Sequence, residues 1–315
     1  MEPQKPPLAK ARIRTRIAPT PSGYLHLGNV LSFALTWALA RSQNGTIALR
    51  IDDLDNTRFR PEYLHNIFET LQFMGIDYDE GPASPDDFLK NYSQHQRLPL
   101  YRQLLDQLQA KNLLYACPCS RSQIAAVSPQ GLYPLTCRSR QVPLSEPGTA
   151  WRIRVPEHEK VCFYDQLLQQ NYEVPLWQQM PDFVVRRKDG IPAYQVASVC
   201  DDLQMGINLV VRGQDLLTST AAQVYLAACT GNTAFANMQF FHHPLLLNAA
   251  GDKLSKSDGA LSVHHMRQQG LSKTELWQLL AQLLGWQGSP VTDAHTFLER
   301  FKQEEVPVVV EQRIA

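Results

Sequence analysis

The chain has 315 residues, 44% of them hydrophobic, and its 30 basic residues balance 30 acidic ones. This length allows one large domain or two smaller ones with hydrophobic cores. The neutral balance argues against a non-specific nucleic-acid coat protein, and no apolar run approaches the ~20 residues that a membrane-spanning helix needs. The N-terminal residues are rich in Pro and Lys and lack the apolar region of a secretory signal, so we expect a cytoplasmic protein.

The first third of the chain predicts alternating strands and helices. Residues 12–18 have the pattern of a strand, residues 27–43 carry apolar side chains at helical spacing, and residues 46–52 are rich in β-branched side chains, as strands are. Further helices are expected at 61–75 and 96–111. The strand–helix–strand order favours a parallel sheet with a nucleotide site at the carboxyl ends of its strands.

The middle of the chain is less regular. Residues 116–147 show no clear period and have the character of an insertion. After it, the predicted elements are a strand at 151–155, a hairpin at 183–198 with its turn at Asp189-Gly190, a buried strand at 207–211, a helix near 219–229, and a helix from the capping box at Ser272 to Leu284.

The loop between the first predicted strand and helix has the composition of a phosphate-binding turn. It reads PTPSGYLHLG over residues 19–28. Gly23 and Gly28 let the backbone approach a phosphate closely. His26 lies at the predicted helix start, where free N–H groups and the helix dipole favour anions. Taken alone, this stretch is also consistent with a simple turn before a helix.

A second polar loop, KLSKS at residues 253–257, carries Lys253 and Lys256. Their ammonium groups suit a departing pyrophosphate, although such a loop alone is also typical of a solvated basic surface. The two motifs, in this order, resemble the HIGH and KMSKS motifs of class I aminoacyl-tRNA synthetases. The resemblance implies adenylation of an amino acid by ATP with Mg²⁺, with His26, Lys253 and Lys256 as catalytic residues.

Further matches narrow the resemblance to the glutamyl- and glutaminyl-tRNA synthetases: Arg16-Ile17-Ala18-Pro19, residues 50–55 (RIDDLD), Val211-Arg212-Gly213, and Tyr194 ahead of Arg212. Over nearly its whole length the chain is most similar to the glutamyl-Q tRNA(Asp) synthetase family, truncated paralogues without an anticodon-binding domain. The resemblance implies tRNA-independent activation of L-glutamate and its transfer to the queuosine base at the wobble position of tRNA(Asp).

The resemblance also implies the site residues by motif position. The glutamate site would consist of Arg16, Ala18, Thr20, Asp52, Tyr194 and Arg212. The ATP site would consist of Pro19, Gly23, His26, Gly28, Asn29 and Lys256. In this site the two arginines would bind the side-chain carboxylate of glutamate, because a guanidinium group binds a carboxylate with two hydrogen bonds. Both arginines are also consistent with ordinary salt bridges.

One position departs from the family. The family has a glutamate in an R-I-E-D-x-D stretch, to bind the substrate ammonium group, where this chain has Asp52. Aspartate is one methylene group shorter, so we expect amino-acid binding that persists but is weaker. We expect Asp53 and Asp55 to be structural and to pair with nearby arginines such as Arg50 or Arg58.

Three cysteines, Cys117, Cys119 and Cys137, cluster with Tyr133. From the residues alone, unmetallated thiols beside a buried tyrosine are an open interpretation. The family has three cysteines and one tyrosine at matching spacing, which implies one structural zinc ion per chain, because a closed four-ligand shell is structural rather than catalytic.

The predicted fold is therefore α/β, with a Rossmann-like parallel-sheet catalytic core, an inserted zinc-binding subdomain and a helical C-terminal segment. We expect a flexible tail at 1–14, a core at 15–115 and 194–260, the insert at 116–193, and the helical segment at 261–315, with no anticodon-binding domain. The predicted partners of this monomer are ATP, L-glutamate and tRNA(Asp) carrying queuosine.

Three alternatives stay open: the catalytic domain of a glutamyl-tRNA synthetase that charges a tRNA 3′ end, an inactive tRNA-binding paralogue, and a coenzyme-forming nucleotidyltransferase. The pair His242-His243 is expected to pack beneath the nucleotide rather than bind metal, and His264-His265 to lie on an exposed helix. Asp201-Asp202 is consistent with a substrate or ribose contact and equally with a structural role.

Overall fold

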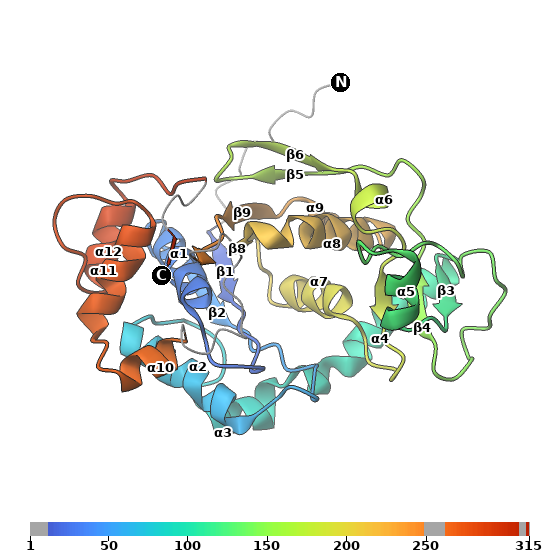
Figure 1. Cartoon of the computed structure of the whole chain (residues 1–315), viewed down its shortest axis with the longest axis horizontal. Coiled ribbons are helices and arrows are strands. Elements are labelled where there is room, and N and C mark those ends of the chain that lie inside the picture. The colour runs from blue at the N-terminus through green and yellow to red at the C-terminus, as the bar shows by residue number, and fades with distance from the viewer. Residues whose placement is uncertain (1–11, 249–261, 309–312, 315) are drawn as a thin grey trace.

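The computed structural model describes residues 12–248, 262–308, 313 and 314. Figure 1 shows the C-terminal helices at one end of the molecule, the strands β3 and β4 at the other, and the strands β1, β2, β5, β6, β8 and β9 between them. In the described part of the chain, no helix combines the length and the apolar character that a membrane crossing requires.

The helices are α1 (Leu27–Arg41), α2 (Pro61–Met74), α3 (Pro85–Asp87), α4 (Leu98–Ala110), α5 (Arg121–Val127), α6 (Leu176–Gln179), α7 (Tyr194–Gln204), α8 (Leu217–Cys229), α9 (Thr233–Ala236), α10 (Val263–Gln268), α11 (Lys273–Leu283) and α12 (Ala294–Phe301). The strands are β1 (Arg14–Ile17), β2 (Thr46–Leu49), β3 (Leu114–Cys117), β4 (Ala150–Ile153), β5 (Val161–Asp165), β6 (Gln170–Val174), β7 (Val184–Arg186), β8 (Leu209–Gly213), β9 (Gln239–His243), β10 (Leu247–Asn248) and β11 (Arg313–Ile314).

Parallel strands form the centre of the molecule, as the strand–helix–strand order predicts. β1 pairs in parallel with β2, and β8 pairs in parallel with β9. β1 and β8 are linked where the backbone N–H of Asn208 donates to the carbonyl of Arg14 at 2.9 Å. The carboxyl ends of β1 and β8 therefore lie side by side, which brings the ends of two distant chain segments to one place.

The boundaries of α1 follow from local chemistry. The side chain of His26 caps the first turn of the helix. In return, Oδ1 of Asn29 accepts the backbone N–H of His26. Beyond its end, Asn44 has a φ of 52°, and a Cβ on Gly45 would lie 2.9 Å from the carbonyl oxygen of Ile13. The chain thus turns sharply into β2 at the predicted Asn44-Gly45 stop.

Two hydrophobic cores flank the parallel strands. One surrounds α1, which is buried on nearly all sides, and is completed by α2, α11 and α12. The other is formed by α4, α7, α8 and the inner faces of β5 and β9. Trp277 of α11 is fully buried and donates its indole N–H to the carbonyl of Met74 at 3.1 Å, which fixes the C-terminal helices to α2.

The hairpin predicted at 183–198 is wrong in its second half. Its first arm is the short strand β7 and its turn at Gly190 has a φ of 86°, but the return pairing is a single bridge between Arg186 and Pro192. Tyr194 then begins helix α7, which buries Val196, Val199 and Cys200. Their i, i+3, i+4 spacing is helical and outweighs the strand-like composition of the segment.

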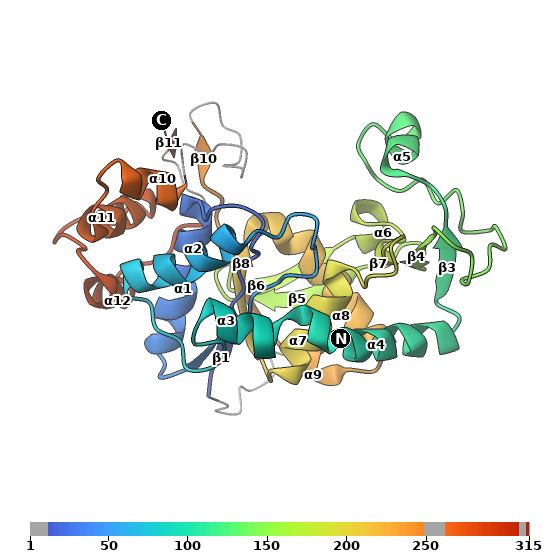
Figure 2. The ribbon, with the colours of Figure 1, turned by 90° about the horizontal axis from the view of Figure 1, so that it is seen from below.

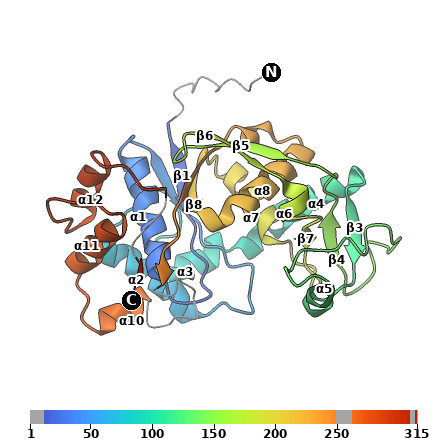
Figure 3. The ribbon, with the colours of Figure 1, turned by 45° about the horizontal axis from the view of Figure 1, so that its top comes forward.

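The predicted insert at 116–193 contains two different structures. β3, β4 and β7 form a separate antiparallel sheet at the far end of the molecule (Figure 2). The hairpin of β5 and β6, which the sequence analysis did not predict, instead joins β9 at the edge of the central sheet (Figure 3). The alternation of buried Val161 and Phe163 with exposed Cys162 is a period-two signal that identifies β5 in retrospect.

Candidate active site

A cavity of about 580 Å³ opens at the carboxyl ends of β1 and β8 and the start of α1. It brings together most of the predicted site residues: Arg16, Ala18, Pro19, Thr20, His26, Gly28, Asn29, Asp52, Tyr194 and Arg212. Gly23 lies in the bend before α1 but does not line the cavity. Lys253 and Lys256 lie outside the described residues.

His26 is held in a defined orientation at the start of α1. Its Nδ1 accepts the backbone N–H of Gly28 at 3.1 Å, so in the neutral ring the proton is on Nε2. A Cβ on Gly28 would lie 3.0 Å from Cε1 of this ring, which explains why glycine follows two positions later. The sequence motif therefore places an imidazole N–H donor at a helix N-terminus, where negative charge is stabilised.

Arg212 is a buried cation with part of its guanidinium unsatisfied. Only 4% of the residue is exposed, and Nη1 donates to Oε1 of Gln223 at 2.9 Å. In the described structure, Nε and Nη2 have no hydrogen-bond partner. Burial lowers the pKa of Arg212 to about 10, because the neighbouring side chains of Tyr194 and Asp202, which favour its charge, do not compensate for the lost hydration. These properties suit an anionic ligand.

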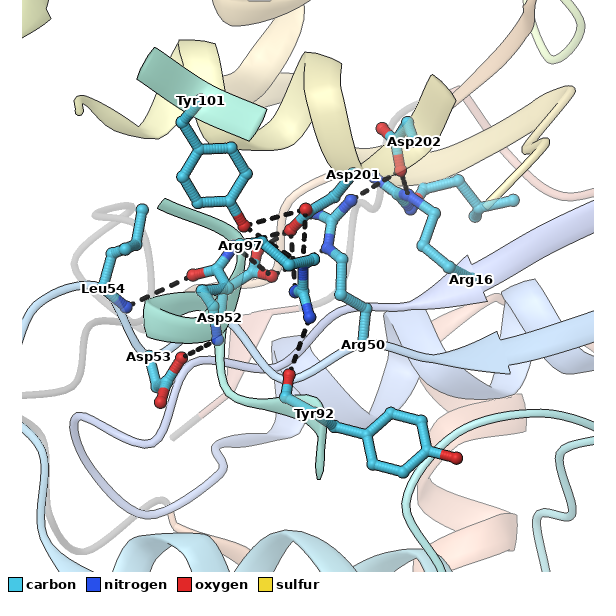
Figure 4. A network of polar contacts seen from close by, with 12 residues as sticks. Arg16, Arg50, Asp52, Asp53, Leu54, Tyr92, Arg97, Tyr101, Asp201 and Asp202 are labelled. Atoms are coloured by element: carbon cyan, nitrogen blue, oxygen red, sulfur yellow. Dashed lines mark hydrogen bonds and ion pairs between the residues drawn. The ribbon is translucent and has the colours of Figure 1, made fainter. Parts of the chain in front are cut away.

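Arg16, Arg50, Asp52 and Asp202 form a buried ionic network, of which Arg16 and Asp52 line the cavity (Figure 4). Oδ1 of Asp202 accepts from Nε of Arg16 at 3.0 Å and from Nη1 of Arg50 at 2.6 Å. Arg50 also binds Asp52, with Nε at 2.7 Å from Oδ1 and Nη2 at 3.1 Å from Oδ2. Asp202 thereby links the two arginines that flank the floor of the site.

The prediction that Asp53 and Asp55 pair with nearby arginines such as Arg50 or Arg58 is only partly right. Asp55 forms an ion pair with Arg187 at 3.7 Å, and in the described residues neither acid pairs with Arg50. Asp53 accepts from the hydroxyl of Ser93 at 2.6 Å and the backbone N–H of Gln94 at 2.7 Å. The side chain of Asp55 accepts from the hydroxyl of Thr57. Arg50 instead turns toward Asp52, two residues along an extended chain and hence on the same side as itself. Burial raises the pKa of Asp52, and the positive charge of Arg50 opposes this rise.

Asp201 has a structural position. It is fully buried and accepts from Nε of Arg97, the hydroxyl of Tyr101 and the amide of Gln94, at 2.8, 2.8 and 2.9 Å. These bonds tie α7 to α4 and to the turn that precedes α4. Gln94 also reaches Oδ1 of Asp52 at 3.3 Å, so the same amide connects this cluster with the cavity.

The paired histidines on β9 face opposite ways, as expected of neighbours in a strand. His243 lines the cavity and donates from Nδ1 to the carbonyl of Pro244 at 3.0 Å. His242 lies behind it, with Nδ1 at 2.5 Å from Oδ2 of Asp165 and Nε2 at 2.7 Å from Oγ1 of Thr220. Burial lowers the pKa of both rings, that of His243 to about 4.

The predicted metal ligands form a compact cluster of their own. The sulfur atoms of Cys117, Cys119 and Cys137 lie within 4.8 Å of one another. Beside them, the hydroxyl of Tyr133 accepts the backbone N–H of Cys137 at 3.0 Å. Three clustered thiols match the soft donor set that zinc prefers, with the phenol in place to complete it. In the described residues no histidine or carboxylate joins this cluster.

A second cavity, of about 720 Å³, adjoins the first. Thr20, Asp52 and Tyr194 line both. From there it extends to Cys119 and Arg121 in the cysteine region and to Arg187. The two cavities thus meet at three residues of the predicted glutamate site, of which Asp52 is the one expected to bind the substrate ammonium group.

The comparisons with known proteins agree with this geometry. Residues 12–312 match the family model described as tRNA synthetases class I (E and Q), catalytic domain. The chain belongs to this family. A protein of Symbiobacterium thermophilum named glutamyl-Q tRNA(Asp) synthetase is 38% identical over 298 residues, which is 87% of each chain. Another of that name, from Ralstonia nicotianae, is 39% identical over 80% of this chain and 79% of its own.

Members of the family differ in length. The glutamate–tRNA ligase of Nitrosomonas europaea is 37% identical over 87% of this chain, but the match spans only 58% of that ligase. Among solved structures, the glutamate–tRNA synthetase of Elizabethkingia anophelis superposes with a TM-score of 0.77 at 24% identity, over 97% of this chain and 68% of that one. This likeness shows the α/β fold of a class I synthetase.

Two residues at the site escaped the sequence analysis. Asp215 lines the cavity and Gln223 bonds to Arg212, and neither was assigned to the site; His243, which was expected beneath the nucleotide, also lines the cavity. Asp215 follows shortly after Arg212 in the chain, so the motif that identified Arg212 could also have identified Asp215. Gln223 lies on an apolar helix one element later and has no local signature.

Proposed function

We propose that this synthetase-family ligase activates L-glutamate with ATP in the absence of tRNA and transfers the glutamyl group to the queuosine base of tRNA(Asp). The observation that supports the glutamate specificity is the buried guanidinium group of Arg212, whose Nε and Nη2 have no hydrogen-bond partner in the described structure, in a residue that lines the same cavity as Asp52. A carboxylate at one end of a substrate and an ammonium group at the other match this pair.

In the first step, an α-carboxylate oxygen of glutamate attacks the α-phosphorus of ATP. The bond from that phosphorus to the bridging oxygen breaks, and pyrophosphate leaves. His26 and the positive end of the α1 dipole would stabilise the charge that grows on the α-phosphate. Mg²⁺ bound to ATP supplies further neutralisation of phosphate charge. Lys253 and Lys256 remain the predicted partners of the pyrophosphate.

In the second step, a hydroxyl of the acceptor base attacks the glutamyl carbonyl, loses its proton and releases AMP. The second cavity supports this step, because it meets the first at Thr20, Asp52 and Tyr194 and leaves the His26 side to the nucleotide. The names of the relatives from Symbiobacterium and Ralstonia support queuosine as the acceptor. The cysteine cluster with Tyr133 would hold a structural zinc ion, which adds folding free energy when bound.

The deciding experiment is ATP–pyrophosphate exchange driven by L-glutamate, with and without tRNA. Exchange without tRNA is the expected result. Exchange only in the presence of tRNA would favour the alternative, a glutamyl-tRNA synthetase, which the Nitrosomonas relative represents. No exchange in either case would contradict activation of glutamate.

The acceptor is tested with matched tRNA(Asp) preparations. Queuosine-containing tRNA(Asp) that lacks its 3′-terminal adenosine should still accept labelled glutamate, whereas intact tRNA(Asp) without queuosine should not. The opposite pattern would assign the transfer to the tRNA 3′ end. In mild alkali, the rate at which the label is lost would also differ between a tRNA charged at its 3′ end and a tRNA modified on its base.

A further inference from the structure

Gln223 lies directly behind Arg212 and outside the cavity wall. It is fully buried on α8, and its Oε1 accepts the hydrogen of Arg212 Nη1 at 2.9 Å. Its own Nε2 has no hydrogen-bond partner in the described structure. A buried amide that satisfies only one of its groups is unusual, because an unpaired buried donor is destabilising.

The bond determines which edge of the guanidinium group remains available. A guanidinium group presents two hydrogens side by side along its Nε–Nη2 edge, which matches the two oxygens of a carboxylate. Arg50 uses this edge to bind Asp52, at 2.7 and 3.1 Å. In Arg212, Gln223 takes a hydrogen of Nη1, the other terminal nitrogen, and the Nε–Nη2 edge is the one without a partner in the described residues.

The orientation of the Gln223 amide is itself constrained. Turning the amide over would bring its NH₂ group against Nη1, and two donors would then face each other. α8 is fixed one turn earlier by Thr220, whose Oγ1 lies 2.7 Å from Nε2 of His242 on β9. On its other side the guanidinium group of Arg212 lies 5.5 Å from the ring centre of Phe240. Helix, strand and ring together leave the arginine little freedom to rotate.

We propose that Gln223 is a positioning residue that aims the Nε–Nη2 edge of Arg212 at the side-chain carboxylate of the substrate and so selects glutamate over glutamine. This inference rests on the proposed function. A carboxylate offers acceptors to both hydrogens of the edge, whereas a carboxamide brings an NH₂ donor against at least one of them. Because Gln223 is neutral, it orients Arg212 without competing for its charge.

Two variants and a control test this role. Gln223→Leu removes the acceptor at similar volume, and Gln223→Glu keeps the acceptor and the shape but adds a negative charge. Thr218→Val is the control on the same helix, since the hydroxyl of Thr218 donates to Gln179 rather than to Arg212. For each protein, ATP–pyrophosphate exchange is measured over a range of L-glutamate and of L-glutamine, and calorimetry measures the binding of L-glutamate directly.

We expect Gln223→Leu to raise KM for glutamate by about tenfold or more, the effect of one hydrogen bond to a charged group. Its kcat should change much less, because the contact stabilises the bound substrate and the transition state to the same extent. The preference for glutamate over glutamine should fall in parallel. Gln223→Glu should also weaken glutamate binding, and more than it weakens glutamine binding, because its charge repels only the carboxylate. Thr218→Val should behave like the parent.

Other outcomes would overturn the inference. If folded Gln223→Leu and Gln223→Glu keep the parent KM and preference, Gln223 does not position Arg212. If binding of glutamate and of glutamine weakens by the same factor, its role is only structural. If Gln223→Leu does not fold, the isosteric Gln223→Glu decides the question. A parent chain that binds no glutamate would overturn the proposed function together with this inference, and calorimetry on the parent separates that case from the others.

Discussion

Arg50 binds both carboxylate oxygens of Asp52, at 2.7 and 3.1 Å, at the floor of the candidate active site. The remaining nitrogen of the same guanidinium group, Nη1, donates to Asp202 at 2.6 Å. Only 1% of the Arg50 side chain is exposed, against 11% for Asp52. The acid that faces the cavity is therefore part of a fixed ion pair, and its charge is shared with the protein before any substrate arrives.

Removal of the Arg50 charge should destabilise the fold. Arg50→Met leaves Asp52 and Asp202 buried without their common cation, and breaking such a buried pair from one side typically costs about 3–5 kcal/mol. Urea unfolding at neutral pH measures the loss. Lys160→Ala, which breaks an exposed pair with Glu173, is the control and should leave the midpoint nearly unchanged. A loss below about 1 kcal/mol for Arg50→Met would contradict the structural role of the network.

The length of the acid at position 52 should govern the affinity for glutamate. Asp52→Glu extends the carboxylate by one methylene group into the cavity, so KM for L-glutamate in the exchange reaction should fall. Asp52→Asn keeps the length and removes the charge, and should raise KM. Comparison of the two variants separates the effect of side-chain length from the effect of charge. An unchanged or higher KM for Asp52→Glu would show that the shorter aspartate side chain does not weaken the binding of L-glutamate.

His26 has two functions that a pair of variants can separate. Its side chain caps α1, and asparagine is also a good N-cap residue. His26→Asn should therefore keep the unfolding free energy close to that of the parent but lower kcat about 100-fold, the typical effect of losing one transition-state donor. His26→Ala should lose activity and, in addition, about 1 kcal/mol of stability.

The outcome for His26 is read from two measurements on the same samples, ATP–pyrophosphate exchange and thermal unfolding. If His26→Asn keeps full activity, the imidazole acts only as a helix cap. If both variants keep the stability of the parent, the cap observed in the structure contributes little to folding, and the residue is retained for the reaction alone.

Buried His243 should make the fold sensitive to mild acid. Burial lowers its pKa to about 4, against about 6.5 when unfolded, and Asp215 and His242 are the titratable groups that influence it. Above pH 6.5 neither state carries the proton. As the pH falls from 6.5 to 4 the unfolded state binds it first, so stability is lost, by about 3 kcal/mol in total.

Unfolding free energies at pH 7 and pH 5 test this expectation. His243→Gln should lose less stability between these two values than the parent does. The control is His65→Gln, which changes an exposed histidine on α2 and should follow the parent. A parent and His243→Gln with the same dependence on pH would show that this ring does not control acid stability.

The cysteine cluster should bind one zinc ion per chain. Elemental analysis of the purified protein should find it, and Cys137→Ser should lose it, whereas Cys162→Ser, at an exposed position outside the cluster, should not. A chelator should lower the unfolding temperature of the parent and not that of Cys137→Ser. If the purified parent contains no metal, and added zinc leaves its unfolding temperature unchanged, the cysteine cluster contributes only to packing.

The sequence by itself determined the local features. Gly28 and His26 identified the start of α1, because a helix cap and a close backbone approach depend on neighbouring residues only. Asn44-Gly45 identified its end for the same reason. The parallel arrangement of β1 and β2 also followed from their order around a helix. Lys253 and Lys256 remain predictions from the sequence, since they lie outside the described residues.

Only the tertiary structure decided the pairing of charges and the course of the sheet. Arg50 meets Asp202 across 152 positions of the chain, and Arg16 meets it across 186. No local pattern distinguishes Asp202 from Asp53 or Asp55 as a partner, because every carboxylate has the same chemistry and burial selects among them. The same holds for Gln223, whose function depends on the strand that packs against its helix. Such long-range contacts exist only once the chain has folded.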